Sequence, residues 1–262
     1  MVTMAGHILP LVATIAIWFF ATGLVAWLDN RDRATFPVAL IVAGIAGVLG
    51  LAMVVIAASL ASAVGAYLGF GGAMLVWAWH EMSFLMGAVA GPRREPARPE
   101  ARGWDRFVDA GSTLIYHEIA LAVTALLLIS LTWTAPNPLG AQVFCLLFAL
   151  RLASKLNIFL GVPNMSDEIL PPHLAYLKSY FGPRRFTALL AATIAATAAL
   201  AAWLGAQALA AAPHGADAVA LSLLFTLAAL GVVEHIFLAL PFRDGALWGW
   251  ALPGQKRAKS GA

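Results

Sequence analysis

The hydrophobic residues of this chain are gathered in long runs that polar residues seldom interrupt. A helix needs about 20 mostly apolar residues to cross the hydrocarbon core of a bilayer. Seven runs are long enough, and their predicted bounds are 7–28, 37–58, 63–90, 113–134, 139–161, 185–207 and 216–240. The pattern therefore predicts an all-α, polytopic membrane protein with about seven transmembrane helices, which form a single bundle domain over residues 1–250.

Two features refine this picture. The sixth run is almost a poly-alanine tract and only weakly hydrophobic for its length, which predicts that it packs inside the bundle. The loop before it contains Pro171 and Pro172, which suit a helix start. After them, Leu174, Leu177 and Phe181 share one helical face. The spacing predicts a short helix in the cytoplasmic interface, with Tyr176 and Tyr180 at headgroup depth.

The composition agrees with a membrane protein, because 61% of the 262 residues are hydrophobic and only 11% are charged. Soluble domains carry about 25% charged residues. The net charge of +3 is then explained by basic loops, so no nucleic-acid partner is expected. The lone Cys145 excludes an internal disulfide and any metal site built from several cysteines.

The basic residues predict the orientation. Of the 16 Lys and Arg, two lie inside a predicted span, which leaves 14 in loops and the tail. All 14 fall on one side of a seven-span arrangement, and such loops stay in the cytoplasm. We therefore expect a bacterial inner membrane protein, cytoplasmic or intracytoplasmic, that passes the bilayer several times. Its N-terminus would be periplasmic, and residues 251–262 would form a basic cytoplasmic tail.

Ionisable residues inside spans are costly and usually face the bundle interior. Here they occur in three His–Glu pairs and in one cationic stretch of the fifth run, all predicted to lie in the cytoplasmic half of the bilayer. This shared depth predicts one intramembrane polar cluster of spans three, four, five and seven. Its members are His80, Glu81, His117, Glu118, Arg151, Lys155, Asn157, Glu234 and His235.

Three interpretations of this cluster stay open. A divalent metal could be held by His80, His117, His235, Glu81, Glu118 and Glu234, because imidazole and carboxylate suit zinc, iron or manganese. A single histidine could instead ligate the metal of a tetrapyrrole. The third interpretation is an internal network of salt bridges and hydrogen bonds. Adjacent residues on a helix point about 100° apart, so each His–Glu pair is poorly arranged to direct both side chains at one metal.

Several strings in and beside these spans resemble the PuhE family, which is described as photosynthetic complex assembly proteins of purple bacteria. They are Gly65–Phe70, Trp77–Leu85, Gly91–Pro96, Tyr116–Glu118, Arg151–Asn157 and Val233–His235. The resemblance covers residues 36 to 250 and implies a place near the reaction centre and light-harvesting subunits. It also implies an influence on the supply of bacteriochlorophyll, but no catalytic residue set.

Two functions follow as hypotheses. The first is a membrane factor for assembly of the photosynthetic reaction centre and core antenna complex, with bacteriochlorophyll as the possible ligand. The second is a membrane-embedded His/Glu metalloenzyme that acts on a pigment or an isoprenoid. A proton-relaying transporter is a weaker third hypothesis, because no inverted repeat is visible.

Overall fold

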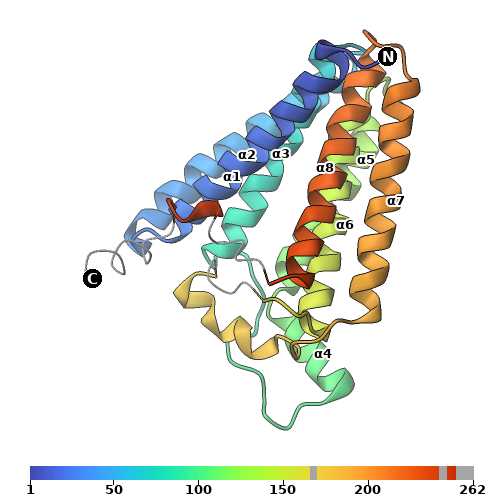
Figure 1. The fold of residues 1–262 in the computed structure, drawn as a ribbon. Helices are drawn as coiled ribbons and strands as arrows, with labels where there is room; N and C mark the ends of the chain where they lie inside the picture. The colour runs from blue at the N-terminus through green and yellow to red at the C-terminus, as the bar shows by residue number, and fades with distance from the viewer. Residues whose placement is uncertain (166–169, 242–246, 252–262) are drawn as a thin grey trace, which may run out of the picture.

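A computed structural model describes residues 1–165, 170–241 and 247–251, and within these ranges the chain is helical without a strand. The elements are η1 (Met4–Ile8), α1 (Leu9–Asp29), η2 (Arg33–Thr35), α2 (Phe36–Ala58), α3 (Ala63–Leu85), α4 (Gly103–Ser112), α5 (Ile115–Thr132), α6 (Leu139–Leu160), η3 (Pro172–Tyr180), α7 (Ala188–Ala210) and α8 (Ala216–Ala239). Figure 1 shows the long helices side by side, with α4 beyond one end of the bundle.

Six helical stretches of the described chain are long and apolar enough to cross a membrane: Met4–Asp29, Arg33–Ala58, Ile115–Thr132, Leu139–Leu160, Ala188–Ala210 and Ala216–Ala239. This confirms the prediction of an all-α polytopic membrane protein. Each of the six corresponds to one predicted run, and the predicted bounds are correct to within a few residues.

The remaining predicted span, α3, is less apolar because it carries Trp77, Trp79, His80 and Glu81. It nevertheless has 23 residues, which rise about 34 Å at 1.5 Å per residue. Its contact with α2 is more extensive than the contact between any other two helices of the described chain. A seventh crossing by α3 therefore stays a prediction that its length and packing support.

The loops without basic residues lie at one end of the bundle, and the loops with basic residues lie at the other. At the end with the N-terminus, the Thr3 hydroxyl donates a hydrogen bond to the Pro213 carbonyl at 2.9 Å. At the same end the Asn137 amide donates to the Ala57 carbonyl at 3.0 Å. These bonds bring the N-terminus and the turns after α2, α5 and α7 together. The loops that hold the basic residues lie at the opposite end, below the helices in Figure 1.

A short helix, η3, forms where the sequence predicted an interfacial one, but its apolar face packs against protein. Leu174 and Leu177 are buried beside Phe84 and Ala90, at the end of α3 and just beyond it. The Tyr180 hydroxyl accepts a hydrogen bond from Arg93 at 2.6 Å. Of these partners, Arg93 belongs to the loop 91–112, and the spacing of η3 alone revealed none of them. The amphipathic helix with an exposed apolar side chain is instead α4, where Trp104 is 73% exposed.

The expectation that the alanine-rich sixth run packs inside the bundle was wrong. This run is α7, which lies at the edge of the bundle, contacts mainly α8 and leaves Trp203 55% exposed. Small side chains let two helices approach closely, so the alanines pack α7 tightly onto one neighbour. The main apolar core lies between α3, α5, α6 and α8, around residues such as Phe70, Leu121, Phe144 and Leu223.

Candidate functional site: an intramembrane polar cluster

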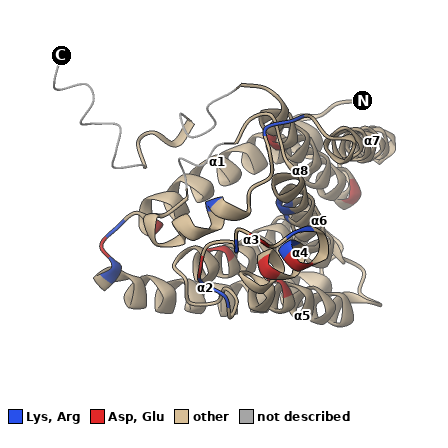
Figure 2. Ribbon diagram, turned by 90° about the horizontal axis from the view of Figure 1, so that it is seen from below, with Lys and Arg blue, Asp and Glu red and all other residues tan. Residues whose placement is uncertain are grey.

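Two ion pairs connect α6 to α3 and to α5. Glu81 of α3 lies 3.2 Å from the Arg151 guanidinium, and Glu118 of α5 lies 2.5 Å from the Lys155 ammonium. Arg151 and Lys155 are four residues apart and so lie on one face of α6. Figure 2, viewed from the basic end, shows charged positions near α3, α4 and α6 and others farther from these helices. We call these two pairs, with His80 and His117, the polar cluster.

The two histidines of the polar cluster are almost completely buried, at 3% exposure for His80 and 0% for His117. Nε2 of His80 shares a hydrogen bond with the Thr124 hydroxyl at 3.0 Å, and Nδ1 has no partner within the described part of the chain. His117 packs its ring against Phe84, with the ring centroids 4.7 Å apart. Its Nε2 lies 3.9 Å from Glu81, too far for a hydrogen bond, so neither ring nitrogen has a hydrogen-bond partner among the described residues.

The other three predicted members make different contacts. His235 uses both ring nitrogens, with the Gly231 carbonyl 2.7 Å from Nδ1 and the Ser154 hydroxyl 3.3 Å from Nε2. Glu234, its neighbour in sequence, accepts a hydrogen bond from the Trp18 indole of α1 at 2.9 Å. Asn157 is fully buried and donates to the Thr193 hydroxyl of α7 at 3.1 Å. The predicted set of nine therefore divides into a polar cluster of six and three separate interhelical contacts.

The side-chain geometry does not favour a metal. Within the described residues, no three His, Cys, Asp or Glu side chains converge in an arrangement that could hold a metal ion. His235 has no free nitrogen to offer, and its partner Glu234 points toward α1. A tetrapyrrole would have to reach the nitrogens of His80 or His117, whose side chains have almost no exposed surface. These residues do not fit either group in this conformation, so we derive no chemistry through one.

A residue just beyond the first predicted span, 7–28, also belongs to this region. Asp29, the last residue of α1, is only 3% exposed, and neither of its carboxyl oxygens has a hydrogen-bond partner in the described chain. Glu81 is the charged group that acts on it electrostatically. Asp29 stands in a polar stretch, Asp29–Arg33, that resembles an ordinary span boundary. Only the packing of α1 reveals that it is buried.

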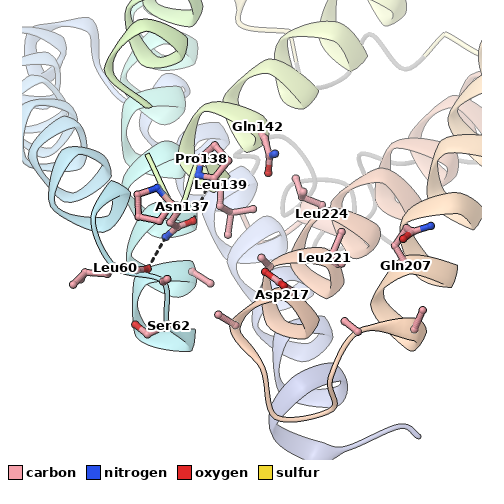
Figure 3. A pocket seen from close by; sticks show the side chains of 17 residues that line it. Leu60, Ser62, Asn137, Pro138, Leu139, Gln142, Gln207, Asp217, Leu221 and Leu224 are labelled. Atoms are coloured by element: carbon pink, nitrogen blue, oxygen red, sulfur yellow. Dashed lines mark hydrogen bonds between the residues drawn. The ribbon is translucent and has the colours of Figure 1, made fainter. Parts of the chain in front are cut away.

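The polar cluster is separate from a cavity elsewhere in the described part of the molecule. That cavity has a volume of about 470 Å³ and lies at the opposite end, between α3, α6, α7 and α8. Figure 3 shows Gln142, Gln207 and Asp217 around it. None of the predicted site residues lines it. The polar cluster is not sealed, however, because the Arg151 side chain is 44% exposed although it lies halfway along α6.

Comparison with known proteins gives two matches. The family described as "Protein of unknown function (DUF3623)" matches residues 4–259 of the chain. An uncharacterised 30.4 kDa protein in the puhA 5′ region of Rhodobacter capsulatus is 36% identical over 245 residues, which cover 92% of this chain and 89% of the relative. No solved structure matches the chain.

Proposed function

This chain belongs to the DUF3623 family of proteins of unknown function, and we propose that it supports assembly of the photosynthetic reaction centre and core antenna complex. In this proposal it is an integral membrane factor that also influences the supply of bacteriochlorophyll to that complex. The observation that carries the proposal is the relative in the puhA 5′ region, which matches over nearly the whole chain. The resemblance to the PuhE family, found in the same spans, agrees with it.

The geometry of the polar cluster supports a role in holding helices rather than in catalysis. Its two ion pairs join α3 and α5 to α6, and the remaining predicted residues join α1, α6, α7 and α8 through hydrogen bonds. A reacting group must touch its substrate, but His80 and His117 are buried beneath other side chains. A scaffold needs a defined arrangement of helices, which such a network provides.

The proposed setting is the inner membrane with the basic end in the cytoplasm. Seven crossings, α3 included, place the N-terminus and the turn near residue 137 in the periplasm. A reporter that is active only in the cytoplasm should then work near residue 100 and after residue 262, and fail near residues 137 and 212. Activity at residue 137 would reverse this arrangement, and activity near residue 100 is the internal control for expression.

Deletion of the gene in a phototrophic host tests the function. We expect less mature reaction centre–core antenna complex, measured by membrane absorption, and no discrete pigment precursor in extracts. A scaffold changes how much complex is built, whereas loss of an enzyme blocks one conversion and its substrate accumulates. The His80→Ala variant should lower complex yield partially, because it removes the hydrogen bond to Thr124 from a network whose members share its energy. The His117→Ala variant should also lower it partially, because it leaves a cavity beside Phe84.

The opposite result would favour the metalloenzyme hypothesis. In that result the deletion strain accumulates one pigment precursor, and a single His→Ala variant accumulates the same precursor to the same extent. The reason is that the effects of mutating residues of one catalytic unit are strongly non-additive. Immunoblots of a tagged protein must show equal amounts of each variant in the membrane. A deletion strain with normal complex yield and normal pigments would contradict the proposed function itself.

A further inference from the structure

Asp29 has a carboxyl group whose surroundings do not suit a negative charge. The residue is 3% exposed, and both of its oxygens lack a hydrogen-bond donor within the described residues. Transfer of a carboxylate from water to such a site is strongly unfavourable, and a group placed there usually becomes neutral instead. The carboxyl of Asp29 therefore needs a partner that the described side chains and backbone do not provide.

The nearby apolar side chains offer no donor. Val25 lies one turn before Asp29 on the same face of α1, and with Leu28 it packs against Phe36 of α2 and Met82 of α3. The Asn30 amide is used by the Ala26 carbonyl. The described part of the C-terminal segment, 247–251, contacts α1 through Trp248 and contains no titratable side chain.

The nearby charges make an ionised Asp29 still less favourable. Its electrostatic neighbour is another carboxylate, Glu81, which already has Arg151 as its ion-pair partner. Asp29 is also the last residue of α1, where the partial negative charge of the helix C-terminus disfavours an anion. The cations of the following loop, Arg31 and Arg33, are exposed, and Arg31 lies over the Trp27 ring at 4.8 Å, so neither compensates the buried charge.

The remaining titratable groups on the neighbouring elements face other partners. His80 of α3 is bonded to Thr124, and His173 of η3 to the Leu85 carbonyl. Glu234 of α8 is bonded to Trp18. The interior of the bundle thus holds four carboxyl groups, Asp29, Glu81, Glu118 and Glu234, against the two cations Arg151 and Lys155. This surplus of carboxyl groups over cations disfavours an anionic ligand at Asp29 and favours a proton.

We infer that Asp29 is a proton-binding site, whose carboxyl carries a proton in the folded protein and loses it only when α1 separates from α3. The proton comes from water at the basic end of the bundle, adds to one carboxylate oxygen and is released to the same side. Loss of the proton places a second negative charge beside Glu81 and so opposes the packing of α1 on α3. The association of these two helices is therefore coupled to pH.

Infrared spectroscopy of the wild-type protein tests the protonation directly. A protonated carboxylic acid has a carbonyl stretching band that a carboxylate lacks. Labelling of aspartate with ¹³C at the side-chain carboxyl should shift this band at neutral pH, and Asp29→Asn should remove it. Asp32→Asn is the matched control, because Asp32 is exposed and caps the next turn through the Ala34 amide at 2.9 Å. Asparagine can provide the same cap.

The stability of the two variants provides a second measurement. A single proton bound only in the folded state changes the folded-to-unfolded ratio by about tenfold per pH unit. Relative to Asp29→Asn, which is neutral at every pH, stability of the wild-type protein should therefore fall as pH rises from about 4, where an unfolded aspartate loses its proton, to the pH at which Asp29 loses its proton in the folded protein. Asp32→Asn should follow the wild type. The inference is overturned if the wild type has no aspartate-sensitive acid band, or if Asp29→Asn and the wild type depend equally on pH.

Discussion

His117 and His235 have the same surroundings in the sequence and opposite surroundings in the fold. Each stands beside a glutamate in a helix that is apolar enough to span a membrane, and each has 0% of its surface exposed. His235 has a hydrogen-bond partner at both ring nitrogens, whereas the residues that the structure describes offer His117 none at either. His235 is thus a satisfied core histidine, and His117 is a buried imidazole held only by its packing.

The difference arises from the helices that face each residue. Opposite His235, α6 presents the hydroxyl of Ser154. Opposite His117, α3 presents the ring of Phe84 and the carboxylate of Glu81, which is directed to Arg151 instead. Buried polar groups without partners are rare in folded proteins and often mark functional positions. His117 and the polar cluster therefore stay our candidate functional site, whereas the hydrogen bond of His235 to Ser154 joins α8 to α6.

The largest effect on stability is expected at the Lys155–Glu118 pair, where the side chains are 18% and 14% exposed. Lys155→Ala leaves Glu118 as an unpaired, mostly buried charge, which we expect to cost about 3 kcal/mol. Addition of Glu118→Gln should restore most of the loss, since both charges are then absent. Protein abundance and thermal unfolding in detergent measure this.

The matched controls for this rescue are Lys155→Ala combined with Glu81→Gln or with Glu234→Gln. Neither carboxylate is paired with Lys155, so neither change should restore stability. Equal rescue by all three glutamates would mean that the polar cluster acts as one diffuse charge. Glu118 would then not be the specific partner of Lys155, and the division of the glutamates into separate pairs would be wrong.

A smaller effect is expected when the two histidines are replaced by leucine. His235→Leu leaves the Ser154 hydroxyl without a partner inside the protein, at a cost of about 2 kcal/mol. His117→Leu breaks no hydrogen bond and should change stability by less than about 0.5 kcal/mol. The proposed function nevertheless predicts a lower complex yield for His117→Leu, at normal protein abundance. A His117→Leu variant as unstable as His235→Leu would mean that His117 has partners that the described contacts omit.

The smallest effect concerns an ion pair outside the membrane spans. Arg98 donates two hydrogen bonds to Asp109 of α4, at 2.8 and 3.0 Å, and these hold the pKa of that carboxyl below its usual value. The bonded carboxylate stabilises the fold above the pKa of the unfolded state, and this contribution is lost as pH falls through the lowered value. Since Arg98 is half exposed, water screens the pair. Asp109→Asn should slightly flatten the acid side of the stability profile, and an unchanged profile would show that the pair contributes nothing.

The long apolar runs determined the helices and most of their bounds, because about 20 apolar residues in a row have few stable arrangements other than a membrane-spanning helix. The prediction for residues 139–161, for example, corresponds to α6 at Leu139–Leu160. The neighbours of each helix were not determined in this way. The alanines of α7 fit an internal position and an edge position equally well, and only their close contact with α8 decided between them.

The sequence also determined that the bundle holds ionisable groups and that most of the basic residues lie at one end. It did not determine which of these groups meet. Glu234 and His235 are adjacent in the chain, yet their side chains leave α8 in different directions and reach α1 and α6. Asp29 looked like part of a polar boundary until α1 was seen to bury it. Partners across helices depend on the rotation and contact of whole helices, which local spacing does not encode, so the tertiary structure alone decided which polar groups are paired and which are not.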